Sequence, residues 1–360
     1  MPAQFRSGEN LEEAFNNDGP AKMKISIAIM AAVLVVAAAS FASTVFAPIA
    51  LALFIIALVW PVQSWLQARI SKLPALAVTV LMTLAVALAF ASLAAWGFGR
   101  VGRSFLADYA RYQSIYDSIV MWLDSHGVSI AGLWAEHFNV RWLLLTTQYV
   151  TGRVNTTLAF WLIALVYVTL GLLEVGDIRR RIEALENREA AHVLLEGSRT
   201  TAAKLRRYML VRTQMSALTG LFVGAFAGIA GLQFAIEWGV IAFTLNYIPF
   251  IGPFIATLFP TLLAMTQFDS WQSVVIVFVC LNVIQFVIGS YIEPRFAGSV
   301  LSISPLAVLF ATLFWTFLWG LFGTFIGVPI ALAALSFCGQ HPSSRWIADL
   351  LGGPSLKKTG

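Results

Sequence analysis

The chain has 360 residues, of which 59% are hydrophobic and only 11% are charged, whereas about a quarter of the residues in a soluble domain carry charge. This composition excludes an ordinary soluble enzyme and predicts an all-α, polytopic protein embedded in a lipid bilayer. The formal net charge of +5 does not indicate a nucleic-acid partner, because the bases gather in segments that a transmembrane topology places on one side of the membrane.

Several long stretches of the chain contain no Asp, Glu, Lys or Arg. They are residues 25–68, 73–99, 154–173, 213–236, 238–268, 270–292 and 296–344. A helix needs about 20 apolar residues to cross the hydrocarbon layer, so each stretch is long enough for a span. The first is long enough for two, and we expect about eight transmembrane helices in total.

Basic residues set the orientation of these spans. If the N-terminus is inside and the spans alternate, the inner segments hold 17 of the 23 Lys and Arg residues. Lys and Arg accumulate in short cytoplasmic segments. The asymmetry therefore predicts that both termini are cytoplasmic.

The same pattern predicts the organisation of the chain. In chain order we expect a flexible cytoplasmic tail (1–24), spans one to three (25–98), an outer amphipathic insert (99–152), span four (153–174), a charged cytoplasmic helix (175–208), a transport core of spans five to eight (209–337) and a second cytoplasmic tail (338–360).

Three of these segments allow more than one interpretation. Apolar residues in the insert recur at three- and four-residue intervals, which is typical of a surface amphipathic helix or of a helix packed on the transmembrane core. For the charged helix we favour a solvated anchor of the topology, with contacts to anionic lipid headgroups as the alternative. In the core, Gly220, Gly224 and Gly228 predict close helix packing within the protomer, with a gating surface as the alternative.

The transport core contains two interrupted spans. The first carries Asn246, Pro249, Gly252 and Pro253, and two prolines so close together cannot continue a regular helix. Irregular backbone persists at membrane depth only within protein or beside a water-filled cavity. We therefore predict that these four residues line a substrate pathway.

The second interruption lies in residues 319–329 and includes Gly327 and Pro329. Residues 250–256 (FIGPFIA) match residues 325–331 (FIGVPIA) at five of seven positions. Interrupted spans at corresponding positions of two halves point to a transporter's binding site. We place Gly327 and Pro329 opposite the first interruption, with a chance match between short apolar segments as the alternative to an internal repeat.

Between the interruptions, Asn282, Gln285 and Glu293 have the spacing of one face of a regular helix. Polar groups inside a span face a partner helix or a cavity. We predict that the two amides extend the pathway and that Glu293 binds a coupling proton or cation. The simpler alternatives are interhelical hydrogen bonds for the amides and an ion pair with Arg295 for Glu293. For Glu237 we favour a position at the membrane interface.

These motifs occur together in a known family. The segments NYIPFIGP (246–253), EPRFAG (293–298), SPL (304–306), FW (314–315) and GVP (327–329) resemble the autoinducer-2 exporter family of membrane permeases. The resemblance implies export of a small signalling molecule or cation/proton antiport, in a bacterial cytoplasmic membrane, by a homo-oligomer. Ser290, Phe296 and Ala297 depart from the family pattern beside the candidate carboxylate, so the substrate and the coupling ion are not carried over.

We expect a permease that moves a small solute or an ion by alternating access, with coupling to protons or cations. A cation/proton antiporter and a non-transporting membrane scaffold are the alternatives, and a solute flux in vesicles would rule out the scaffold. An intramembrane enzyme is disfavoured because the four histidines lie outside the spans and neither His-Glu-x-x-His nor Gly-x-Ser-x-Gly occurs. Cys280 and Cys338 lie in apolar stretches, which predicts no disulfide, no metal site and no cofactor.

Overall fold

The computed structural model describes residues 36–126, 154–297 and 303–352, and single N-terminal positions at 27, 30, 31 and 34. In this part of the chain every regular element is a helix, and one isolated β-bridge joins Ile303 to Gly352. The predicted all-α fold class is confirmed. The chain forms two compact units, residues 1–47 and 48–360. The described positions of the first unit are helical, apart from a turn at Ala42.

Six helices within the described ranges are long and apolar enough to cross a membrane. They are α2 (Ser43–Gln67), α3 (Lys72–Ala107), α7 (Val154–Glu183), α8 (Arg188–Ile229), α11 (Trp271–Phe286, continued by the π-helix η1, Val287–Ile292, and by α12, Glu293–Ala297) and α13 (Pro305–Cys338). The remaining helices are α4 (Tyr109–Ser125), α9 (Ala235–Leu245), α10 (Ile251–Gln267) and α14 (Arg345–Leu351).

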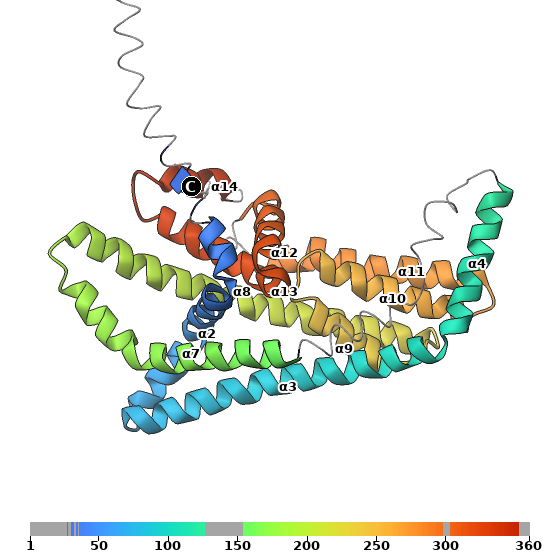
Figure 1. The fold of residues 1–360 in the computed structure, drawn as a ribbon, viewed down its shortest axis with the longest axis horizontal. Helices are drawn as coiled ribbons and strands as arrows, with labels where there is room; N and C mark the ends of the chain where they lie inside the picture. Colours follow the sequence, from blue (N-terminus) through green and yellow to red (C-terminus); the bar gives the residue numbers. More distant parts are fainter. Residues whose placement is uncertain are drawn as a thin grey trace, which may run out of the picture. The chain divides into compact units, whose positions relative to one another are not determined.

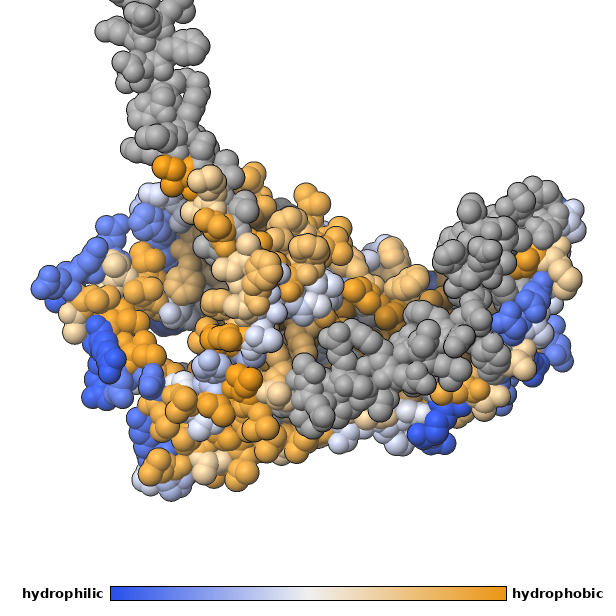
Figure 2. All heavy atoms as spheres, viewed as in Figure 1, coloured by the Kyte–Doolittle hydropathy of each residue, from blue (hydrophilic) through white to orange (hydrophobic). Residues whose placement is uncertain are grey.

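Much of the surface of these helices is hydrophobic, as Figure 2 shows. Leu81 is 64% exposed and Phe317 is 86% exposed, which suits side chains that face lipid tails rather than water. The protein is therefore a multi-pass membrane protein. The stretch 25–68, which we expect to hold two spans, lies partly outside the described residues, so the expected total of eight stays a prediction.

In place of one interrupted span, α9 and α10 form a helical hairpin. Residues 246–250 make the turn at its tip. At its open end the Gln267 side chain donates to the Gly231 carbonyl (2.6 Å) and accepts from the Gln233 amide (2.9 Å). Because the two ends of the pair meet, the helices are antiparallel. With 11 and 17 residues, they measure about 17 and 26 Å, so neither crosses ~30 Å of hydrocarbon alone.

The long helix α13 folds back on itself in the same manner. Gly320 has φ 61° and ψ −140°, a conformation that is essentially restricted to glycine. Beyond this kink, the hydroxyls of Thr316 and Thr324 are hydrogen-bonded at 2.7 Å, and a Cβ on Gly323 would overlap the Trp315 carbonyl. The two arms of α13 therefore form a second hairpin whose tip is Gly320.

The tip of the second hairpin lies before the Gly-Val-Pro motif that the sequence singled out. Gly327 and Pro329 belong to the helical second arm. A Cβ on Gly327 would lie 2.9 Å from the Ala311 carbonyl oxygen on the first arm. Gly327 therefore allows the two arms to approach each other, and the chain reverses at Gly320 instead.

Residues of the two hairpin tips correspond to each other differently from the pairing that the match of residues 250–256 with 325–331 predicts. Gly252 closes the first tip, because a Cβ there would overlap the Leu245 carbonyl. Gly323 has the same place in the second hairpin, beside the carbonyl of Trp315. The structural counterpart of Gly252 is therefore Gly323. The match between the two short apolar motifs pairs Gly252 with Gly327 instead.

Both hairpins pack against α8, which has 42 residues (Figure 1). In its C-terminal half, Gly220 and Gly224 contact Gly239 of α9, and a Cβ on Gly239 would lie 2.8 Å from the Gly220 carbonyl oxygen. In its N-terminal half, Gly197 lies against the Phe337 ring of α13. The prediction that Gly220 and Gly224 allow close packing within the protomer is confirmed.

The first part of the insert packs on the helical core. Tyr112 of α4 stacks on Phe105 of α3, with ring centroids 4.8 Å apart, and Phe105 meets Phe259 of α10 edge-on at 5.8 Å. Of the two interpretations of the insert, this contact supports packing on the core for its described part. Residues 127–153 lie outside the described ranges.

The contact between α8 and α9 predicts a specific loss of stability. Gly239→Ala places a methyl group against the Gly220 backbone, so we expect the purified protein to lose about 1–3 kcal/mol of unfolding free energy. Gly102→Ala is the matched control, because no atom lies within 4 Å of the added Cβ. Thermal unfolding in detergent measures both variants, and equal melting temperatures would contradict the tight contact.

Candidate functional site

A row of polar side chains runs along the buried face of α8. Tyr208, Arg212, Ser216 and Thr219 follow one another at intervals of four, four and three residues, which places them on one helix face. All four are buried, with at most 9% of any residue exposed. Polar groups at membrane depth are unfavourable without partners, so the groups that face this row define the site.

The strongest contact in the row is an ion pair between α8 and α12. Nη1 of Arg212 donates to Oε1 of Glu293 at 2.8 Å, with side chains that are 10% and 25% exposed. Nε of Arg212 is also buried, and it has no hydrogen-bond partner among the described residues. The guanidinium is therefore held by one carboxylate oxygen and keeps a second buried donor.

Glu293 is presented by an unusual piece of helix. It directly follows η1, and its amide donates to the Ile288 carbonyl five residues back. Single π-helical turns inside α-helices are rare and are frequent at functional sites. The wider turn changes the register between α11 and α12, so the regular helical face predicted to join Asn282, Gln285 and Glu293 is not continuous.

The tip of the first hairpin contacts the same face of α8. Nδ2 of Asn246 donates to Oγ of Ser216 at 3.2 Å, and the Tyr247 hydroxyl donates to Oγ1 of Thr213 at 3.0 Å. Ser216 lies one helical turn beyond Arg212 on α8. The hairpin tip and the ion pair are therefore neighbours along α8.

The structure places the predicted pathway residues in different surroundings. Pro249 and Gly252 are buried in the first tip and Pro253 is half-buried there. The Gln285 amide nitrogen is buried without a partner in the described structure. Asn282 is exposed and donates to the Phe278 carbonyl of its own helix.

Gly327 and Pro329 lie on the other side of the ion pair along α8. They are buried in the second arm of α13. Their neighbour Val328 belongs to an apolar cluster that also contains Leu205 and Tyr208 of α8. The structure thus brings Asn246 and Glu293 to one face of α8, whereas Gly327 lies against Ala311 of the first arm of α13.

Sequence reasoning missed Arg212, Tyr208 and Ser216. Arg212 is the last charged residue before the charge-free stretch 213–236, and it was counted among the cytoplasmic bases. Its four-residue spacing from Tyr208 and Ser216 was a signal that indicated a polar helix face. No pattern in the sequence identified Glu293 as its partner.

A buried carboxylate is found at the base of the first hairpin. Glu237 is 5% exposed and pairs with Arg100 of α3 at 2.7 Å. The Arg100 guanidinium also lies over the Trp96 ring at 5.7 Å. This pair connects α3 to α9, and its Arg100 side chain is 49% exposed.

Neither cysteine is bonded to the other, since Cys280 and Cys338 are both free. Among the residues whose placement is described, no group of three His, Cys, Asp or Glu side chains is arranged to hold a metal ion. The chemistry of the site therefore has to be read from its ion pair, its amide and its hydroxyl groups.

Several known proteins are similar to this chain over nearly its full length. TqsA, the AI-2 transport protein of Escherichia coli K12, is 28% identical over 341 residues, which cover 91% of this chain and 95% of TqsA. YhhT of the same organism, described as a candidate transport protein, is 25% identical over 334 residues, which cover 92% of this chain and 94% of YhhT.

A shorter match, to a candidate transport protein of Haemophilus influenzae, is 34% identical over 148 residues, or 40% of this chain and 41% of that protein. The family model described as "AI-2E family transporter" matches residues 27–342. That range includes α8, both hairpins and the Arg212–Glu293 pair. By this match, the chain belongs to the AI-2E family of membrane transport proteins.

Proposed function

We propose that this protein is a secondary transporter that moves a small solute or an ion across the membrane by alternating access. Membrane transport is the function of its family. The finer proposal rests on one observation, which is the ion pair between the buried Arg212 and the partly buried Glu293. The pair lies where the polar face of α8 meets α12, one helical turn from Ser216, which contacts the first hairpin tip. Such a pair is unfavourable at membrane depth unless it is used.

The ion pair is suited to couple transport to a proton or a cation. Loss of one member of a buried pair leaves an uncompensated charge, which destabilises a protein by about 3–5 kcal/mol. When a proton or a cation occupies Glu293, Arg212 therefore needs another acceptor, and α8 and α12 rearrange. In this proposal Glu293 carries the coupling ion, and Arg212 links its occupancy to the packing of α8.

The two hairpins are the parts that such a rearrangement moves. The first contacts α8 beyond Arg212, through Ser216, and the second packs on α8 before Arg212. The ion pair therefore lies between the two hairpin contacts along α8, and a rearrangement of the pair affects both contacts. The pathway residues in this proposal are Asn246, Pro249, Gly252, Pro253, Gln285, Gly327 and Pro329. Asn282 is left out because its amide bonds its own helix.

A cation/proton antiporter uses the same site, and the partly buried Glu293 carboxylate favours it among the alternatives. A non-transporting scaffold has no need of a buried ion pair between two helices. The basic residues support a topology with both termini in the cytoplasm, and a location in the bacterial cytoplasmic membrane stays a prediction from the family resemblance. Homo-oligomers stay a prediction from the family resemblance.

Glu293→Gln tests the coupling role. Because Arg212 then keeps a buried charge without its carboxylate, we expect transport to fall by about tenfold or more, and the remaining flux to lose its pH dependence. Flux is measured in proteoliposomes with an internal pH-sensitive dye, under imposed Na⁺ or K⁺ gradients and with a panel of small solutes. Unchanged flux with an unchanged pH profile would remove Glu293 from the mechanism.

Two further variants separate coupling from folding. Glu183→Gln makes the same chemical change in an exposed pair, with Arg179 at 2.9 Å, and should leave flux and stability within error. The double variant Arg212→Gln/Glu293→Gln removes both charges and should recover thermal stability. If the double variant also recovers pH-dependent transport, the pair is structural only.

Asn246→Ala tests the contact between the first tip and α8. It leaves the buried Ser216 hydroxyl without its partner, which is expected to cost about 1–3 kcal/mol of stability, and it should raise the KM of the transported solute. Ser336→Ala is the control, since this buried hydroxyl donates to the Leu332 carbonyl of its own helix. A KM that responds equally to both variants would contradict a pathway at the tip.

A further inference from the structure

A basic surface lies on the N-terminal half of α8, away from the Arg212–Glu293 pair. It borders an open pocket of about 580 Å³ that is lined by Glu196, Arg199, Thr200, Ala203, Lys204 and Arg207. Their spacing of three and four residues places all six on one face of the helix. Three bases against one carboxylate leave this pocket with a net charge of +2.

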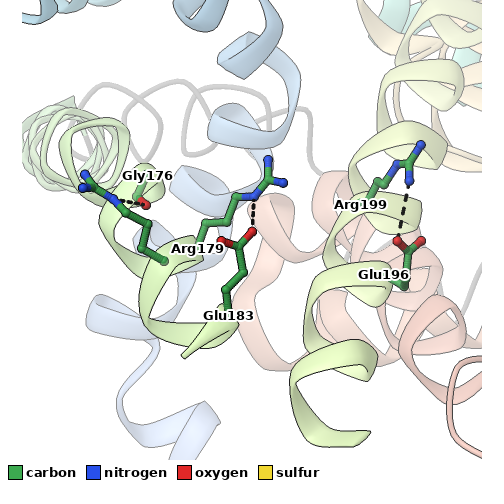
Figure 3. A network of polar contacts seen from close by, with 6 residues as sticks. Gly176, Arg179, Glu183, Glu196 and Arg199 are labelled. Atoms are coloured by element: carbon green, nitrogen blue, oxygen red, sulfur yellow. Dashed lines mark hydrogen bonds and ion pairs between the residues drawn. The ribbon is translucent and has the colours of Figure 1, made fainter. Parts of the chain in front are cut away.

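The bases of the pocket are available to a ligand. Arg199 and Glu196 pair at 3.5 Å with side chains that are 82% and 41% exposed, as Figure 3 shows, and exposed pairs of this kind contribute about 0–1 kcal/mol. Arg207 donates through Nη2 to the Phe296 carbonyl at 3.0 Å, which uses one of its several N–H groups. Lys204 lies between them and is half-buried.

The position of the pocket along α8 indicates what kind of ligand it fits. Bases occur on α8 up to Arg212, and no charge follows until Glu237. Leu210 and Leu221 continue the face of Arg207 and are 49% and 67% exposed. Figure 2 shows the hydrophilic surface at the α7–α8 end directly beside hydrophobic surface. The pocket therefore lies where a polar headgroup meets lipid tails.

We propose that Arg199, Lys204 and Arg207 bind the phosphate of an anionic phospholipid headgroup. Guanidinium, ammonium and the Thr200 hydroxyl supply the donors that phosphate oxygens accept, and the acyl chains lie along Leu210. Because Arg207 also bonds the Phe296 carbonyl of α12, the bound lipid holds the helix that presents Glu293. The lipid site does not depend on what the protein transports.

The test uses the full-length protein in mild detergent, with bound lipid counted by native mass spectrometry. Phosphatidylglycerol is titrated against the double variant Arg199→Gln/Lys204→Gln, and each lost base should weaken binding by about fivefold. Arg181→Gln/Arg188→Gln is the matched control, because it removes the same charge from exposed positions near the α7–α8 turn. Arg207 is kept, so that α12 stays in place.

Two further titrations decide the ligand. Phosphatidylcholine should bind at least tenfold more weakly than phosphatidylglycerol, and inorganic phosphate should not displace the lipid at millimolar concentration. Equal loss of phosphatidylglycerol in the pocket variant and in the control variant would overturn the proposal. Binding of phosphatidylcholine as tight as that of phosphatidylglycerol would also overturn the proposal. Displacement of the lipid by free phosphate would overturn it too, because it would indicate a site for the anion alone.

Discussion

The buried guanidinium of Arg212 sets a requirement that the surrounding helices have to meet. It is the last charged residue of α8, because no charge follows it until Glu237, and its side chain is 10% exposed. A charge in such a place is tolerated only with a close partner of opposite sign. Glu293 meets this requirement because α11 continues through a π-helical turn into α12. The ion pair therefore depends on a local departure from α-helical geometry.

The two hairpins have a related requirement, because the backbone groups at each chain reversal need hydrogen-bond partners. A chain reversal exposes N–H and carbonyl groups that lipid cannot satisfy. At the first tip the Ile248 amide donates to the Leu245 carbonyl, and Asn246 reaches Ser216 on α8. At the second tip, the Thr324 hydroxyl donates to the Gly320 carbonyl at 3.2 Å. Because these partners belong to the protein, the reversals can lie inside it, and the polar tips then adjoin groups that can bind a solute or an ion.

The charged residues of α7 and α8 form two classes with different roles. Pairs such as Arg179–Glu183 are exposed on their helices (Figure 3), and water and salt screen them, so they contribute little to stability. Their bases stay available to anionic ligands at the membrane surface. Arg212 is on the same helix as Arg199 and Arg207, but it is buried, so its charge acts on Glu293 and not on lipid. Burial, and not residue type, separates the two roles.

The sequence by itself determined the class of the protein, a polytopic helical membrane protein, and the first interruption. Charge-free stretches predict helices in lipid because a helix satisfies the polar groups of its own backbone there, and Pro249 with Pro253 cannot lie inside a regular helix. Only the tertiary structure decided that both interruptions fold back as hairpins, that the second reverses at Gly320, and that Arg212 meets Glu293 across 81 residues of sequence. The rule that residues three or four apart share one helix face assumes a regular α-helix, and the π-helix η1 interrupts the α-helical period. How closely α8 and α9 pack at Gly220 and Gly239 is likewise a property of the assembled helices.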